Sequence, residues 1–84
     1  MKATKNPELL ALKGKMREKD ITYRKLAKQI GISLNTLNGR LNGHSVFNID
    51  EVNDIAIELN IEASEIVRYF FPTMLRNETN GRED

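Results

Sequence analysis

Four short polar side chains lie within eight positions near the middle of the sequence: Asn35, Thr36, Asn38 and Asn42. An asparagine amide donates and accepts hydrogen bonds at once, so it can pair bidentately with N6 and N7 of adenine. Threonine can hydrogen-bond to a base edge or contact the methyl group of thymine. Both are poorer helix formers than the lysine, glutamate and alanine typical of a merely solvated helix. The pattern therefore indicates a helix face suited to reading the edges of bases.

Two short helices, Tyr23–Ile30 and Leu34–Leu41, are predicted to position these side chains. Thr22 is placed to cap the first helix, and Gly31 to end it in the left-handed conformation. Ser33 follows only two residues later and is placed to cap the second helix. So short a turn cannot make the two helices antiparallel, and they must cross steeply, as in a helix-turn-helix.

Apolar residues of this segment lie on the opposite face from the amides. Ala27 is small enough to let the two helices approach closely, and Ile32 is placed to fill the core beneath the turn. Leu37 and Leu41 share one face of the second helix and are expected to anchor it.

The rest of the chain also follows helical periodicity, and no useful length of sequence alternates as a strand does. We expect three further helices: one beginning at Asn6-Pro7 and ending near Glu18–Asp20, one from Asn48 to Asn60 with Glu51 completing a capping box, and one from about Ala63 to Phe71 before Pro72. The predicted fold class is all-α, with five helices in one domain over residues 1–75. Residues 76–84 are polar and are expected to form a flexible C-terminal tail.

The composition excludes several classes of function. The 84 residues include no cysteine, which excludes disulfides, thiolate metal sites and a cysteine nucleophile. The single histidine, His44, argues against most histidine-built metal centres, and we expect no metal and no cofactor. No carboxylate pair stands beside a nucleophile and no glycine-rich phosphate loop follows a strand, so we expect no enzyme activity. The sequence shows no membrane-spanning stretch and no secretory signal, so a cytoplasmic location is expected.

Charge divides the sequence into two unlike halves. Residues 1–44 hold ten Lys or Arg and three Asp or Glu, a net charge of +7, whereas residues 45–84 hold three and nine, a net charge of −6. This asymmetry predicts one positive and one negative face, the positive one suited to a polyanion.

The stretch LAKQIGISLNTLNGRLNG, residues 26–43, resembles the helix-turn-helix of the lambda-repressor-like (Cro/C1, XRE-type) regulators of phages and bacteria. The residues that carry the resemblance are Leu26-Ala27, Gly31-Ile32-Ser33, Leu37 and Leu41-Asn42-Gly43. The likeness continues through VFNIDEVNDIAIELNIEASEIVRYFF, residues 46–71. It implies a compact five-helix domain that binds operator DNA as a two-fold dimer.

The resemblance also implies roles for individual residues. Those expected to face the bases in the major groove are Leu34, Asn35, Asn38 and Gly39. Those expected to contact the DNA backbone are Thr22, Tyr23, Lys28, Thr36, Arg40, Asn42, His44 and Ser45. Four positions depart from the family pattern: Leu34 and Gly39 replace polar base readers, Tyr23 replaces a bracing glutamine, and Arg40 is the fourth. Arg40 stands where many relatives have a buried aliphatic residue, and its guanidinium is expected to extend toward a phosphate.

The function predicted from the sequence is a double-stranded-DNA-binding transcriptional regulator, of the phage-repressor type, that acts as a homodimer. A protein-interaction module on the same fold, such as an antitoxin or adaptor, is the alternative. A non-specific nucleoid-type binder is a further alternative, but the uncharged amide face argues against it.

Overall fold

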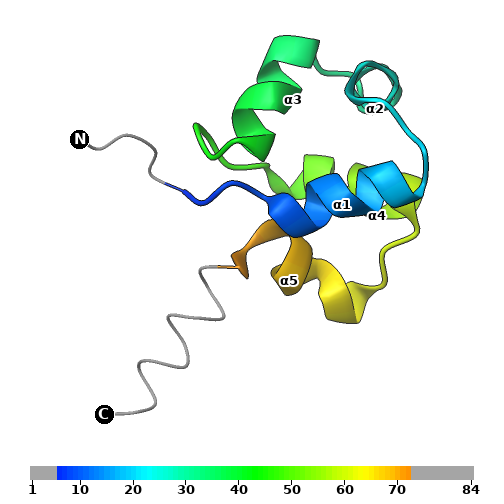
Figure 1. Cartoon of the computed structure of the whole chain (residues 1–84), viewed down its shortest axis with the longest axis vertical. Helices are drawn as coiled ribbons and strands as arrows, with labels where there is room; N and C mark the ends of the chain where they lie inside the picture. The colour runs from blue at the N-terminus through cyan, green and yellow to red at the C-terminus, as the bar shows by residue number, and fades with distance from the viewer. Residues whose placement is uncertain (1–5, 73–84) are drawn as a thin grey trace.

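The computed structural model describes residues 6–72, which form five α-helices, one 3-10 turn and no strand. The elements in chain order are α1 (Leu10–Glu18), α2 (Tyr23–Ile30), α3 (Leu34–Leu41), α4 (Ile49–Leu59), the 3-10 turn η1 (Ala63–Glu65) and α5 (Ile66–Phe70). The predicted all-α class is confirmed (Figure 1). The tail expected at residues 76–84 lies outside the described residues.

Helices α2 and α3 form one end of the molecule, and η1 with α5 forms the opposite end (Figure 1). Between them lies a single core, to which α1, α2, α3 and α4 each contribute fully buried side chains. These are Leu12, Met16, Leu26, Leu37, Leu41, Ile55 and Leu59. Phe70 of α5 closes this core by packing edge-on against Phe47, with ring centroids 5.6 Å apart. The core thus holds the helix-turn-helix rigidly against the rest of the domain.

The helix-turn-helix forms as local sequence predicts. The Thr22 hydroxyl accepts the Lys25 N–H at 3.0 Å, and Ser33 accepts the Thr36 N–H at the same distance. Gly31 adopts φ +78°, which lets the Ile32 N–H turn back to the Ala27 carbonyl at 3.0 Å. These local hydrogen bonds cap α3 and end α2 within a few residues, so they fix the tight turn between the two helices.

One of the predicted helix boundaries is wrong, and another is displaced by one residue. Helix α1 begins at Leu10 rather than at Pro7, because the N–H groups of Asn6 and Leu9 donate to the carbonyls of Gly43 and Leu41. The chain there runs extended across the end of α3 instead of starting a helix. The last helix opens as a 3-10 turn and ends at Phe70. Its end follows from Pro72, which disfavours helical dihedrals at the preceding residue, and Phe71 has φ −135°.

Candidate nucleic-acid interface

The amide-bearing side of α3 faces away from the core. Leu37 and Leu41 have no exposed surface, whereas Asn35 is exposed and Asn38 is partly exposed. Leu34 and Gly39, the two other predicted base readers, are also partly exposed on this helix. The helix therefore presents hydrogen-bonding amides outward while its leucines fix its position.

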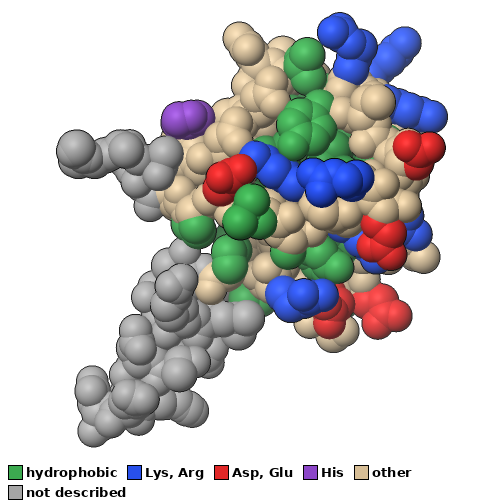
Figure 2. All heavy atoms as spheres, viewed as in Figure 1, with side chains coloured by type: hydrophobic (Ala, Val, Ile, Leu, Met, Phe, Trp, Pro, Cys, Tyr) green, Lys and Arg blue, Asp and Glu red, His purple; other side chains and the backbone are tan. Residues whose placement is uncertain are grey.

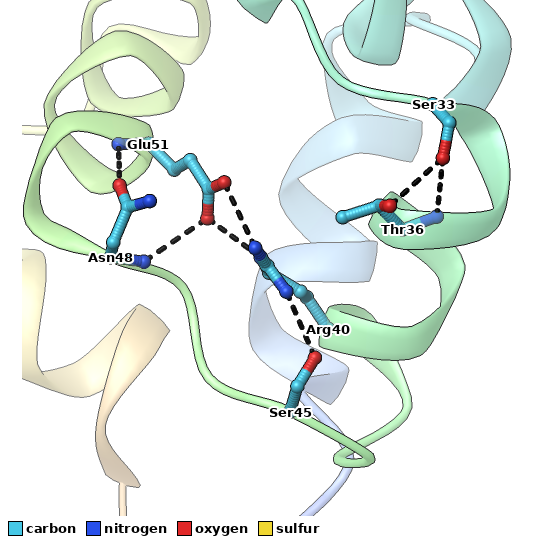
Figure 3. Close-up of polar contacts among 6 residues, drawn as sticks. All are labelled: Ser33, Thr36, Arg40, Ser45, Asn48 and Glu51. Carbon is cyan, nitrogen blue, oxygen red and sulfur yellow. Dashed lines mark hydrogen bonds and ion pairs between the residues drawn. The ribbon is translucent and has the colours of Figure 1, made fainter.

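The N-terminus of α3 holds a pair of hydroxyls in a defined arrangement (Figure 3). The Ser33 hydroxyl donates to Thr36 Oγ1 at 2.8 Å while it accepts the Thr36 N–H. Because Thr36 Oγ1 already accepts this bond, the proton of the Thr36 hydroxyl remains to be donated elsewhere. An anionic oxygen such as a phosphate is a suitable acceptor for it.

Asn42 follows the last turn of α3, and its amide is held by a lysine of α1. The Lys13 ammonium donates to Asn42 Oδ1 at 2.7 Å and also pairs with Glu8. An ammonium group can only donate, so this contact assigns the oxygen of the amide to Lys13. The NH₂ group of Asn42, on the exposed side chain, is left to donate outward.

Arg40 does not extend outward as expected but turns toward α4 (Figure 3). Its Nε and Nη2 donate to the two carboxylate oxygens of Glu51 at 2.6 and 3.1 Å, and its Nη1 donates to Ser45 at 3.0 Å. The hydrogen bonds from Arg40 hold the pKa of Glu51 below its ordinary value, against the opposing effect of burial. Glu51 also raises the pKa of Arg40. Two parallel hydrogen bonds between oppositely charged groups thus link α3 to the start of α4.

The loop after α3 is closed by two backbone features. The His44 N–H donates to the Gly39 carbonyl at 2.9 Å, which holds the exposed His44 side chain beside the end of α3. Gly43 has φ +89°, and a Cβ atom there would lie 2.1 Å from the Asn6 carbonyl oxygen. Only glycine fits this crossing of the N-terminal segment and the loop.

Positive charge gathers over α2, where Arg24, Lys25 and Lys28 are all exposed (Figure 2). No Asp or Glu occurs between Asp20 and Asp50 in the sequence. The single histidine marks the loop beyond α3, so α3 lies between the basic side chains over α2 and His44 in this view (Figures 1 and 2). A surface with basic side chains along one edge and uncharged amides beside them matches the phosphates and base edges of a DNA groove.

Comparison with known families decides the identity of this arrangement. Residues 11–72 match the family model of the Cro/C1-type HTH DNA-binding domain, which spans all of α2, α3, α4 and α5. The chain belongs to the Cro/C1-type helix-turn-helix family. It is therefore a DNA-binding regulator. A search of curated proteins found no match.

The remaining residues of this Cro/C1-type domain that are predicted to contact the DNA backbone lie at the start of α2, along α2 and in the loop after α3. Thr22 is exposed at the start of α2, Tyr23 is partly buried against the core, and Lys28 is exposed. Ser45 is exposed in the loop, and its hydroxyl already accepts a bond from Arg40. Among the residues predicted to contact the DNA backbone, Arg40 is the one whose charged group pairs with a carboxylate of the domain itself, that of Glu51.

Two residues of this Cro/C1-type domain make contacts that the sequence does not signal. Lys13 belongs to the positive half of the sequence, and Glu51 belongs to the predicted capping box. The capping box is present, because Glu51 also accepts the Asn48 N–H at 3.0 Å. Their additional partners lie 29 and 11 residues away in sequence, and no local pattern signals such contacts.

The described residues offer few other kinds of site. Within residues 6–72, no three side chains of His, Cys, Asp or Glu gather so as to hold a metal ion. None of the helices in this range is long and apolar enough to cross a lipid bilayer.

Proposed function

We propose that this Cro/C1-type regulator is a phage-type repressor that recognises a specific operator by placing α3 in the major groove. The observation that carries the proposal is the division of α3 into a buried leucine side and an outward amide side. Asn35 and Asn38 read adjacent bases, and Leu34 contacts a thymine methyl group. Gly39 lets the helix backbone approach the bases, because it carries no side chain.

The groups around α3 hold the DNA backbone in this proposal. The Asn42 amide and the hydroxyls of Thr22, Tyr23, Thr36 and Ser45 donate to phosphates, as does the His44 side chain. Lys28 with its basic neighbours on α2 releases counterions from the duplex. These contacts supply sequence-independent affinity, and they orient α3 for base recognition.

One domain of this size reads one half-site, so we propose that a homodimer occupies a two-fold operator with half-sites about one helical turn apart. An apolar pocket of about 290 Å³ beside the loop after α3 supports this arrangement. Its walls include Val46, Phe47 and Phe71, and Val46 is half exposed. Because this pocket lies beside the loop that follows α3, we place the contact with the second copy there. Bound in this way in the cytoplasm, the dimer represses by blocking access to a promoter.

Selection from a pool of random duplexes tests the proposal directly. The full chain is mixed with the pool at near-physiological salt, and bound molecules are amplified and sequenced over several rounds. We expect a palindromic consensus with adenines in each half-site. Enrichment of no common sequence, despite retention of DNA, would contradict base reading by α3. A consensus with a single half-site would contradict the dimer alone.

A further inference from the structure

A second exposed surface runs along α4, on the acidic half of the chain. Ile49 and Ile57 are 81% and 69% exposed, although isoleucine is usually buried. They border an open groove of about 530 Å³ between α4 and the η1–α5 segment. The apolar residues that line it include Ile49, Val52, Ala56, Ile57, Ile61 and Ile66.

Two parallel stripes follow from the spacing along α4. Ile49, Asn53 and Ile57 recur every four residues and so lie along one line of the helix. Asp50, Asp54 and Glu58 recur at the same spacing one position later, and all three are exposed. A row of carboxylates therefore runs alongside the apolar groove, and Glu62 adds another exposed carboxylate beyond the end of α4.

This surface is separate from the proposed DNA interface. None of the residues that line the groove belongs to α2, α3 or the turn between them. The η1–α5 wall of the groove lies at the opposite end of the molecule from α2 and α3 (Figure 1). DNA is not a suitable occupant, because phosphates would meet the carboxylates of α4.

We propose that the α4–α5 groove binds an amphipathic helix of another protein, whose apolar side chains enter the groove and whose lysines or arginines pair with Asp50, Asp54 and Glu58. Helices bind to apolar grooves through residues at three- and four-residue spacing, and complementary charge directs the encounter. A second copy of this chain is less suitable, because a two-fold contact centred on the groove would bring the acidic stripes of both copies to one interface.

The probe is a short synthetic helix with leucine on one face and lysine on the other, titrated into the full chain. A matched peptide with glutamate in place of every lysine is the control for charge. Binding is followed by calorimetry and by the backbone amide shifts of the ¹⁵N-labelled chain. We expect the lysine peptide to shift amides along α4 and η1, and the glutamate peptide to bind at least about tenfold more weakly.

Two substitutions distinguish binding of the peptide in the groove from general attraction of the peptide to an acidic surface. Ile57→Ser should weaken binding of the lysine peptide about tenfold, equivalent to about 1.4 kcal/mol. Leu10→Ser is the matched control, because Leu10 is an equally exposed apolar residue (68%) on α1, outside the groove. Both variants should bind duplex DNA as the parent chain does, so this result is independent of the proposed operator function.

Several results would overturn the proposal. One is equal binding of the two peptides, and another is an equal loss in Ile57→Ser and Leu10→Ser. A third is a set of shifted amides that lies outside α4, η1 and α5. The last is a dimer of the full chain in sedimentation analysis that Ile57→Ser dissociates, since the groove would then bind a second copy.

Discussion

The ammonium of Lys13 donates to the side-chain oxygen of Asn42 over 2.7 Å, so a lysine of α1 determines which way an amide at the end of α3 points. Lys13 is itself only 15% exposed and also pairs with Glu8. A residue outside the helix-turn-helix therefore orients one of the groups that we propose to contact the DNA backbone.

Lys13→Met should weaken binding to all duplexes severalfold without changing base preference, because the Asn42 amide is then free to rotate. Lys15→Met is a matched control, since it removes the same charge from α1 but has no contact with Asn42. Equilibrium titrations with operator and random duplexes measure both affinities. In an Asn42→Ala background, the Lys13 substitution should cost no more than the Lys15 substitution. A larger cost in that background would mean that Lys13 acts on DNA directly.

Asn38→Ala should reduce the affinity for the cognate operator by about 1–3 kcal/mol, because a bidentate amide–base pair is lost. Its affinity for random DNA should hardly change. Lys28→Ala is the comparison, and it should weaken both affinities alike and reduce the slope of the salt dependence by about one unit. Equal loss of both affinities in Asn38→Ala would show that this residue does not read bases.

Gly39→Ala and Gly14→Ala form a second matched pair. A Cβ atom at Gly39 would meet only His44 Cβ at 4.0 Å, and one at Gly14 would meet nothing within 4 Å. Each substitution should stabilise the fold by about 0.5–1 kcal/mol, because alanine favours a helix over glycine. Only Gly39→Ala should weaken operator binding, since it adds a methyl group where we propose that α3 approaches the bases. Thermal unfolding measures the change in stability, and operator titration measures the change in affinity. Unchanged operator binding in both variants would show that Gly39 does not lie in the DNA interface.

Gly43→Ala should destabilise the domain by about 2–4 kcal/mol, from left-handed strain together with overpacking. The new Cβ atom would overlap the Asn6 carbonyl oxygen, so the N-terminal segment must detach from the end of α3. Urea denaturation followed by circular dichroism measures the loss. A variant as stable as the parent chain would mean that this crossing contributes little.

The Arg40–Glu51 pair predicts a pH dependence of stability. The pKa of Glu51 is lower in the folded protein than its ordinary value of 4.5, because Arg40 and the Asn48 N–H bond its charged form. The unfolded chain therefore binds this proton more readily. The stabilisation is present above about pH 4.5 and is lost as the pH falls through the folded pKa.

Glu51→Gln should lower the free energy of unfolding by about 1–2 kcal/mol at pH 7, and the difference from the parent chain should shrink between pH 5 and pH 3. Glu58→Gln, which changes an exposed carboxylate of the same helix, serves as the control. Denaturation midpoints measured across this pH range check the prediction. A difference between Glu51→Gln and the parent chain that stays constant with pH would show that the carboxylate charge contributes nothing.

The sequence by itself determined the features that depend on neighbouring residues. Thr22, Ser33 and Asn48 cap their helices, and Gly31 and Asn60 end theirs in the left-handed conformation, because each acts on backbone groups within a few positions. The periodicity of leucines fixed which side of α3 is buried for the same reason.

The tertiary structure decided the contacts between distant segments. In the folded domain Lys13 bonds to Asn42 and Arg40 pairs with Glu51. Asn6 packs against Gly43, and α1 begins at Leu10 and not at Pro7. Such pairings depend on how near packed helices bring their side chains, and a local pattern carries no measure of that distance. The orientation of the groups that border α3 is therefore a property of the packed domain, whereas the chemistry of its exposed face is already present in the order of its residues.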